Sequence, residues 1–319
     1  MWIFGATGGR CYTSAMTARN HPDHLIRAVA RDSGLRISAV VSTGVVEEAA
    51  KRHHTSRVAT VALGRGLTSG LLLATLTKGP ERVTVQLQGD GPLGSITVDA
   101  TDAGDVRGYV RTAEVEVEQH RERPRLAEAM GRNGVVNVTR DLGLRDLYQG
   151  QTAIVTGEID EDVEAYLRES EQVPSALGCE VVLDKQGRIV AAGGILVQTL
   201  PGGDADLVRP LQHALRTGAL FDLLRDGERS AEAMARRLLP ELAIDLVGDE
   251  RLVRFQCRCS DERIRVMLRM MTVTDLDEMI AEQKPAQVTC NFCNREFAVP
   301  PSEIDEIRQE IAGGPRTRN

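Results

Sequence analysis

Two short cysteine pairs near the C-terminal end are the residues best suited to chemistry. Cys257 and Cys259 form a CxC motif, Cys290 and Cys293 form a CxxC motif, and 30 residues separate the pairs. Each short turn directs two sulfurs toward a common point, so the two pairs predict one tetrahedral metal site. No histidine follows His213, so the predicted site is all-sulfur. Four thiolates favour one Zn²⁺, with an iron–sulfur centre as the lesser alternative.

Such a site is either a purely structural zinc centre or a redox switch. A catalytic zinc is not expected, because four thiolates leave no position for water. A thioredoxin-like role for Cys290 and Cys293 is disfavoured, because no βαβ pattern surrounds them. Structural zinc supplies roughly 10–16 kcal/mol of apparent folding free energy to small modules. One disulfide within each pair would return only about 1.5–2 kcal/mol per loop. Oxidation would therefore eject zinc and unfold the module.

The composition is that of an ordinary globular protein. Of the 319 residues, 42% are hydrophobic and 27% charged, while aromatic residues make up only 3%, so we expect an aliphatic core. A net charge of −7 argues against nucleic acid as the main partner. No apolar run reaches the ~18 residues of a membrane span, and we see no secretory signal. We therefore predict a cytoplasmic protein with reduced thiols and no membrane partner.

The first residues contain a glycine-rich stretch that resembles a nucleotide-binding turn. Only four residues precede Gly5, and no acidic residue ends a following strand at the usual distance, so we do not expect a dinucleotide site. Residues 1–19 are instead predicted to be a disordered extension, with translation starting near Met16. Cys11 lies in this extension as an unpaired thiol.

Residues 20–203 are predicted to form one α+β core domain with packed helices and a largely antiparallel sheet. Helical periodicity is assigned to 21–31, to the segment after Ser42, to 58–76 and to 161–171. Alternating apolar residues predict strands at 83–88, 95–99, 106–111, 134–139 and 152–158, and a hairpin of 180–183 with 188–198. The glycines within 58–76 do not fit GxGxxG and indicate close helix packing.

Two further regions follow the turn at 201–204. Residues 204–250 mix apolar stripes with charges and helix breakers, which predicts a metastable helical linker. Residues 251–319 are predicted to be a zinc-binding redox-switch domain, with helices at 261–271, 274–282 and 302–312. Capping boxes are expected at Thr274 with Asp277 and at Ser302 with Asp305.

Four motifs together resemble the heat shock protein 33 family of redox-regulated bacterial chaperones. They are VTVQLQGDGP at 83–92, AAGG at 191–194, FQCRCS at 255–260 and CNFC at 290–293. The resemblance covers about residues 20–312, and the four cysteine positions show no departure. The first 19 residues have no counterpart in it.

The resemblance implies an ATP-independent holdase. The reduced form would bind one zinc through Cys257, Cys259, Cys290 and Cys293 and be inactive. Oxidation would form the redox-active disulfides Cys257–Cys259 and Cys290–Cys293, release zinc, and unfold the module and the linker. The active form would be a homodimer that binds proteins unfolding under oxidative or heat stress.

Other interpretations remain weaker. We find no Walker loop, nucleophile elbow or HExxH motif, so no enzyme is predicted. His53 and His54 are expected at the surface, and Cys179 is expected to be a small core residue. Arginines near the cysteines could favour thiolates; they are Arg254, Arg258, Arg263 and Arg295. The alternative function is a constitutive protein- or RNA-binding protein with a purely structural zinc ribbon.

Overall fold

The computed structural model describes residues 22–77, 81–117, 122–141 and 147–313. The first part contains β1 (His24–Ala30), β2 (Leu35–Val41), α1 (Thr43–His53), α2 (Arg57–Ala74), β3 (Arg82–Gly89), β4 (Ser95–Thr101), β5 (Asp105–Val110), α3 (Ala127–Met130), β6 (Gly134–Asp141), β7 (Tyr148–Ala153), α4 (Ile159–Glu169), β8 (Ser175–Leu183) and β9 (Ile189–Thr199). The second part contains α5 (Val208–Thr217), α6 (Ala219–Arg225), α7 (Ala231–Leu238), β10 (Asp245–Leu246), β11 (Arg251–Leu252), β12 (Arg254–Phe255), α8 (Asp261–Leu268), α9 (Val273–Ala281), β13 (Ala286–Thr289), β14 (Glu296–Val299) and α10 (Pro301–Gly313). The predicted extension, with its glycine turn and Cys11, lies outside the described residues.

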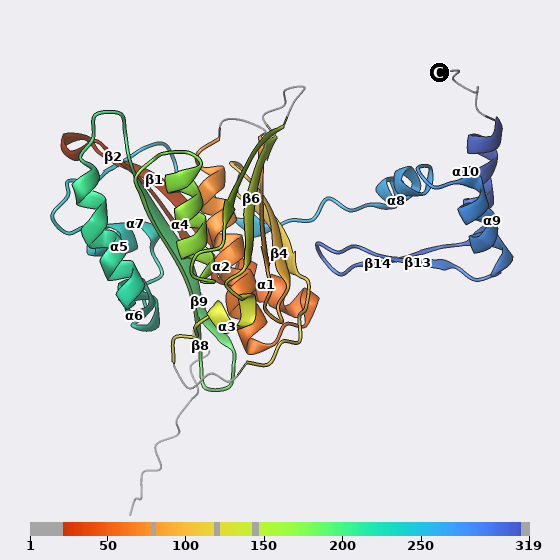
Figure 1. Cartoon of the computed structure of the whole chain (residues 1–319), viewed down its shortest axis with the longest axis horizontal. Helices are drawn as coiled ribbons and strands as arrows, with labels where there is room; N and C mark the ends of the chain where they lie inside the picture. The colour runs from red at the N-terminus through yellow and green to blue at the C-terminus, as the bar shows by residue number, and fades with distance from the viewer. Residues whose placement is uncertain (1–21, 78–80, 118–121, 142–146, 314–319) are drawn as a thin grey trace, which may run out of the picture.

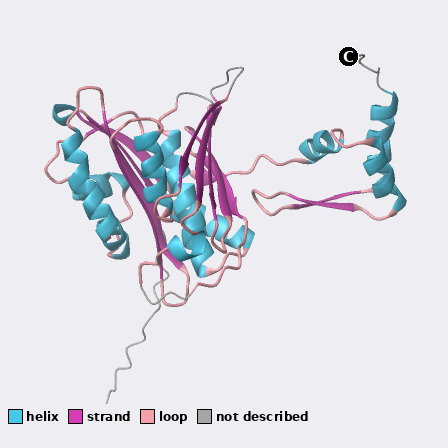
Figure 2. Cartoon of the chain, viewed as in Figure 1, coloured by secondary structure: helices cyan, strands magenta, loops and turns pink. Residues whose placement is uncertain are grey.

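Two six-stranded sheets form the larger body of the protein (Figures 1 and 2). Sheet A has the order β10-β1-β2-β9-β8, and β11 also pairs with β1. Sheet B has the order β12-β5-β4-β3-β6-β7. The strand pairs are antiparallel except for β12 with β5. The predicted α+β class is confirmed, although two sheets replace the single expected one.

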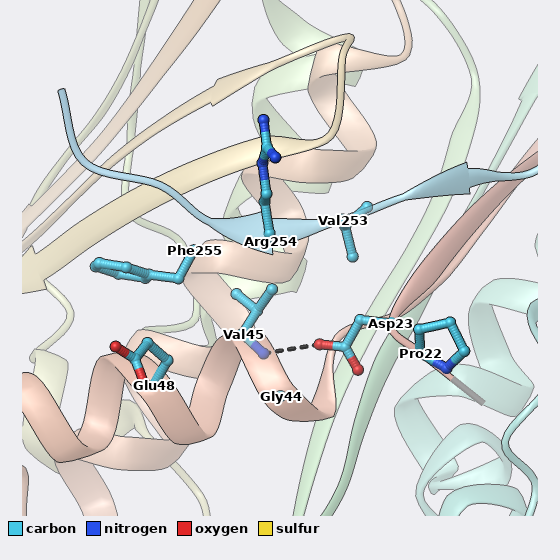
Figure 3. A pocket seen from close by; sticks show the side chains of 8 residues that line it. All are labelled: Pro22, Asp23, Gly44, Val45, Glu48, Val253, Arg254 and Phe255. Carbon is cyan, nitrogen blue, oxygen red and sulfur yellow. Dashed lines mark hydrogen bonds between the residues drawn. The ribbon is translucent and has the colours of Figure 1, made fainter. Parts of the chain in front are cut away.

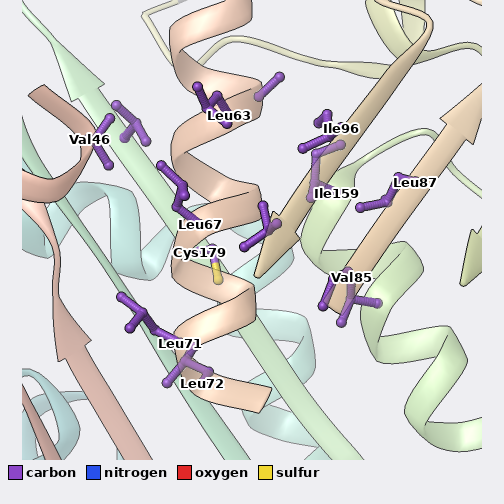
Figure 4. Packing of buried hydrophobic residues seen from close by; sticks show 14 of the residues in the cluster. Val46, Leu63, Leu67, Leu71, Leu72, Val85, Leu87, Ile96, Ile159 and Cys179 are labelled. Atoms are coloured by element: carbon purple, nitrogen blue, oxygen red, sulfur yellow. The ribbon is translucent and has the colours of Figure 1, made fainter. Parts of the chain in front are cut away.

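Helix α2 lies between the two sheets and forms the centre of the core (Figure 4). Its leucines pack against β4, β8 and β9, and every residue from Val58 to Ala74 is buried. A Cβ on Gly64 would lie 2.6 Å from Val181, and one on Gly70 would lie 2.6 Å from Val98. The helix glycines therefore permit close packing, as predicted, and do not form a phosphate loop.

The prediction of a helix at 21–31 is wrong, because this segment contains strand β1. β1 pairs with β2 over seven residues, from His24 with Val41 to Ala30 with Leu35. Leu25 packs into the core between the sheets, whereas Ile26 packs on the opposite face of sheet A. Both faces are thus largely buried, so the usual apolar–polar alternation is missing and the spacing imitates a helix.

The prediction of a strand at 152–158 is only partly confirmed. β7 ends at Ala153, and the next residues turn around Asp162. The Asp162 carboxylate accepts hydrogen bonds from the backbone N–H groups of Val155, Thr156 and Gly157 at 2.8–2.9 Å. This turn aims the chain into α4, which starts near its predicted position.

Arg65 on α2 is a buried cation that holds three carboxylates. Its side chain is 1% exposed and lies 2.9 Å from Glu158, 3.6 Å from Asp160 and 2.7 Å from Glu180. Burial lowers the pKa of Arg65, but the three carboxylates outweigh burial and raise it. Arg123 also binds Glu180 and donates to the backbone oxygen of Arg216 at 2.7 Å. The cluster therefore connects the core to the end of α5.

The helices α5, α6 and α7 cover the face of sheet A that points away from α2 (Figure 1). Leu215, Phe221 and Met234 from these helices pack against Ile37 and Ile195 of the sheet. The N–H of Ala231, at the start of α7, donates to Nε2 of the buried His24 at 3.0 Å. The segment predicted as a linker is thus folded on the core domain. In the described residues, no helix is long and apolar enough to cross a membrane.

Candidate metal centre

The four predicted cysteines meet at one point in the structure. Their Sγ atoms all lie within 4.8 Å of one another. The Sγ–Sγ distance is 3.7 Å between Cys257 and Cys290 and 3.4 Å between Cys259 and Cys293. Four sulfurs about 2.3 Å from a tetrahedral Zn²⁺ stand about 3.8 Å apart. The donor set and its spacing therefore fit zinc, and Cys257, Cys259, Cys290 and Cys293 would hold it.

Short local structures position the two pairs. Strand β12 leads directly into Cys257, and the side chain of Ser260 caps α8 just after Cys259. Cys290 and Cys293 occupy the tip of the β13–β14 hairpin. There the N–H groups of Cys293 and Asn294 donate to the Cys290 oxygen at 3.2 and 2.8 Å. This turn points both sulfurs toward the first pair.

The module that carries the cysteines has a small hydrophobic core. Seven buried side chains form it: Ile264, Leu268, Leu276, Phe297, Val299, Ile304 and Ile307. The helices lie near their predicted positions, but both predicted capping boxes are wrong. Thr272 and Asp275 form the box of α9, and α10 begins at Pro301, so Ser302 lies inside it. A core this small has little stability of its own, so a metal cross-link would contribute strongly to folding.

The cysteine tip contacts sheet B through Arg107 on β5. Nη1 of Arg107 donates to the Cys257 Sγ at 3.7 Å, and its guanidinium lies 3.9 Å from the centre of the Phe292 ring. Two further N–H groups bind Asp99 at 2.7 and 3.1 Å and fix the Arg107 side chain. Tyr109 also meets Phe292 edge-on, with ring centroids 5.3 Å apart.

Sequence reasoning missed Arg107, because it lies 150 positions before Cys257 and only the fold brings them together. Of the arginines predicted near the thiols, Arg254 binds Asp105 and Arg295 stacks on Phe297. The only sequence signal for Arg107 is a charged residue between the buried Val106 and the buried Gly108 on a strand.

The predicted surface position of the histidine pair is half correct. His54 is exposed, whereas His53 is partly buried and its Nε2 lies 3.2 Å from the Phe292 oxygen. Asn294 beside it donates to the Arg52 oxygen at 3.0 Å. The tip is therefore held by α1 as well as by β5.

The metal-free thiols differ in their acidity. Burial raises the pKa of Cys257, but hydrogen bonds from the Cys259 backbone and from Arg107 outweigh it and lower the pKa to about 7. Burial and the neighbouring thiols raise the pKa of Cys259, and burial likewise raises that of Cys293. Cys257 is therefore the thiol that Arg107 helps to keep ionised.

Replacing Arg107 with alanine is expected to speed zinc release from the reduced, zinc-loaded protein. The substitution removes a hydrogen bond to sulfur and a cation–π contact, together worth about 1–3 kcal/mol, so release should be roughly 5–150-fold faster. A colorimetric chelator added in excess measures the rate. Arg82→Ala is the matched control, because Arg82 also lies near Asp99, at 4.0 Å. Equal release rates for the two variants would contradict the role of Arg107.

Cys179, the remaining described cysteine, is a core residue, as predicted. It is fully buried beside Ser69, and burial raises the pKa of its thiol well above the ordinary value. It lies on β8, so it takes no part in the four-cysteine cluster.

The fold and the site define a mixed α+β protein with a four-cysteine centre of the metal-binding type, and the comparisons show its family. The model of the Hsp33 protein family matches residues 23–300, and the chain belongs to this family.

Relatives and a solved structure agree with this assignment. The 33 kDa chaperonin of Trichodesmium erythraeum is 39% identical over 91% of this chain and 94% of its own length. That of Oceanobacillus iheyensis is 35% identical over 90% of this chain and 99% of its own length. The crystal structure of the 33 kDa chaperonin, or heat shock protein 33 homologue, from Thermotoga maritima matches with a TM-score of 0.79 and 30% identity. It aligns over 91% of this chain and 99% of its own. The family and these names support a chaperone.

Proposed function

We propose that this protein is a redox-regulated, ATP-independent holdase of the cytoplasm. In the reduced state, the four cysteines hold one Zn²⁺, and the protein does not bind clients. Oxidation forms Cys257–Cys259 and Cys290–Cys293, releases the metal and unfolds the linker at 204–250. The oxidised protein, as a homodimer, then binds proteins that are unfolding under oxidative or heat stress. The convergence of the four sulfur atoms within 4.8 Å carries the proposal.

The chemistry of the switch follows from the thiols. Bound Zn²⁺ keeps all four sulfurs deprotonated and cross-links the two halves of the module. Each pair of thiolates gives two electrons to one molecule of hydrogen peroxide and forms a disulfide, while two protons from the solvent convert the two peroxide oxygens into two waters. Two peroxides therefore convert the four thiols into two disulfides, which cannot bind zinc. With seven buried apolar side chains, the module is then expected to unfold.

The linker is connected to the cysteines through a short stretch of chain. β11, β12 and Cys257 follow one another directly, and β12 lies on the edge strand β5 of sheet B. The N–H of Gln256 donates to the Val106 oxygen at 2.8 Å. Loss of the folded module would remove the contacts of Phe292 with Arg107 and Tyr109, which hold the end of this stretch. The connection between the module and the linker therefore runs along the backbone.

Release of the linker would uncover a large apolar surface. The outer face of sheet A contributes twelve buried side chains to its contact with the linker: Ile26, Ala28, Ala30, Leu35, Ile37, Ala39, Val41, Ala176, Val182, Ala191, Ile195 and Val197. Exposed contiguous apolar surface of this extent is typical of protein-binding sites. It would serve an unfolding client without requiring a particular sequence.

Polar contacts fix α5 on the core and make it a point where the linker can be loosened. The carboxylate of Glu164 accepts from Arg216 at 2.9 Å and from Gln212 at 3.2 Å. Its other oxygen accepts from the N–H of Leu177 at 3.0 Å. Burial raises the pKa of Glu164, and the hydrogen bonds oppose this effect. The contact with Arg216 on α5 therefore helps to keep the Glu164 carboxylate ionised.

Arg216→Ala is expected to loosen the linker in the reduced protein. The substitution removes the cation that stabilises the negative charge of the buried Glu164 carboxylate. The cost should be about 1–3 kcal/mol, so opening of α5 becomes roughly 5–150-fold more frequent. Limited proteolysis within residues 204–250 measures it. Arg209→Ala is the matched control, because Arg209 lies on the same helix and binds Asp206, which is exposed. Equal cleavage rates would show that Glu164 does not fix α5.

Light scattering from a thermally unfolding client tests the proposed function. Suppression of aggregation is expected from peroxide-oxidised protein and not from reduced, zinc-loaded protein. Equal suppression by both forms would favour a constitutive binding protein with a structural zinc. Suppression by neither would exclude the holdase.

A further inference from the structure

The outer edge of strand β1 is closed by the backbone of residues 245–253, which comprise the end of the linker and the residues directly after it. Strands β10 and β11 both pair antiparallel with β1, at Val29–Asp245 and at Leu25–Arg251 among other positions. The N–H of Val247 donates to the Arg27 oxygen at 2.8 Å, and the N–H of Val253 donates to the Asp23 oxygen at 3.1 Å. Alternate residues of a strand face the same neighbour, so Leu25 and Val29 also direct their backbone groups toward the linker.

The linker segment fits this edge poorly. On its other side β1 pairs with β2 over seven residues, whereas β10 and β11 contribute two residues each. The side chains of Leu246, Val247 and Leu252 are 46%, 44% and 64% exposed. Residues 248–250 bulge away from β1 between the two paired stretches, with Gly248 at a φ of +72°. A segment with so few buried contacts belongs to the least stable part of the fold.

A pocket lies beside the same segment, between the residues that follow β11 and helix α1. It has a volume of about 550 Å³ and lies where the linker leaves β1 and passes over α1 (Figure 3). Val253 and Phe255 line it from the linker side, and Val45 and Glu48 line it from α1. The backbone after β11 is therefore not packed tightly against α1.

Without the linker, β1 would be an unprotected edge strand. Proteins usually block such edges with lysine, proline, a bulge or a covering segment. The sequence of β1 is HLIRAVA, whose one strongly charged side chain, Arg27, is engaged by Asp102. The remaining protection comes from residues 245–253, where Arg251 also binds Asp102, at 2.5 Å.

We propose that the outer edge of β1 is a client-binding site that works by β-strand addition. Residues 245–253 occupy it in the reduced protein as a substitute strand. This inference rests on the proposed function and specifies its partner as an extended segment of an unfolding polypeptide, paired antiparallel with residues 23–29. Backbone hydrogen bonds supply the affinity, so the site accepts many sequences. The uncovered face of sheet A lies beside it and receives the client's apolar side chains.

A labelled peptide tests the site in the full-length protein. The peptide carries the sequence of residues 244–253 and a fluorophore, and polarisation measures its binding. We expect it to bind oxidised protein and to bind reduced, zinc-loaded protein at least about tenfold more weakly, because the linker competes there. An unfolding client added in excess should displace it. Equal binding to both forms, or no displacement by the client, would overturn the inference.

N-methylation of the peptide separates strand addition from general hydrophobic binding. Methyl groups on the nitrogens of Val247 and Val253 remove the two N–H groups that pair with β1. They should weaken binding about tenfold or more, as expected for two lost hydrogen bonds. The matched peptide is methylated at Leu246 and Leu252, whose N–H groups face away from β1, and its binding should stay within about twofold of the parent. Equal loss for both peptides would exclude backbone pairing.

A variant of the protein gives a second measurement. Val29→Pro removes an outward N–H while leaving the bonds between β1 and β2, and Val29→Ala is its control. Oxidised V29P should release zinc normally and bind the peptide about threefold or more weakly than V29A. Equal binding would contradict the proposal. One outcome is that the oxidised wild-type protein suppresses client aggregation but binds the two methylated peptides equally well. In that case this inference fails and the proposed function stands. If the oxidised protein does not suppress aggregation, the proposed function fails first.

Discussion

Replacing Cys257 with serine is expected to cause the largest change in the reduced protein, a loss of most bound zinc. The substitution removes one of four sulfurs that lie within 4.8 Å of one another. A structural zinc contributes roughly 10–16 kcal/mol to the folding of a small module. Among the described residues of the module, seven buried apolar side chains are available to replace that contribution. The module should therefore unfold, and the linker should become sensitive to protease without any oxidant.

Metal analysis and limited proteolysis of the purified protein measure both effects. Cys179→Ser is the matched control, because it makes the same change at a buried cysteine outside the cluster. It should retain about one zinc per chain, as a closed four-thiolate site requires. A C257S protein with full zinc occupancy and unchanged protease sensitivity would show that the cluster does not control the linker.

The second large effect is expected at Arg65, in the core. Arg65→Met leaves the carboxylates of Glu158 and Glu180 buried without their main cation. Removing one partner from a buried ion cluster costs about 3–5 kcal/mol. We therefore expect the free energy of unfolding to fall by about this amount, which urea denaturation of the reduced protein measures. The loss would be a large fraction of the stability of a typical domain.

Two further variants show whether the loss of stability comes from the buried charge cluster. Arg57→Met changes an exposed arginine at the start of the same helix and should alter stability by less than about 0.5 kcal/mol. The triple variant Arg65→Met, Glu158→Gln, Glu180→Gln removes the uncompensated charges and should recover part of the loss. If Arg65→Met is as stable as Arg57→Met, the buried cluster does not hold the core together.

The local patterns in the sequence predicted much of the fold. β3 and β6 alternate apolar and polar residues, because each strand has one buried face, and this alternation is visible in the sequence. The sequence of β1 resembles that of a helix because both faces of the strand are largely buried, one in the core between the sheets and the other under the linker helices. Such covering depends on tertiary packing, which a local window does not contain.

The four-cysteine metal site could be predicted from the spacing of the cysteines, and the structure brings the same four residues together. Arg107 could not be predicted, since its contact with Cys257 joins residues 150 positions apart. The burial of Arg65 could not be predicted either, because the side chain of an arginine in a helix normally lies in solvent. In each case the informative feature is the set of long-range partners, which only the fold supplies.

The central claim is that the cysteine centre controls whether the linker is folded on sheet A. Hydrogen–deuterium exchange of reduced and peroxide-oxidised protein tests it most directly. We predict that oxidation strongly increases exchange in α5–α7 and in β10 and β11, while α2 and β3 keep their protection. Unchanged exchange in α5–α7 after both disulfides have formed would contradict the claim. Equal loss of protection in α2 would contradict it as well, because the core would then unfold together with the linker.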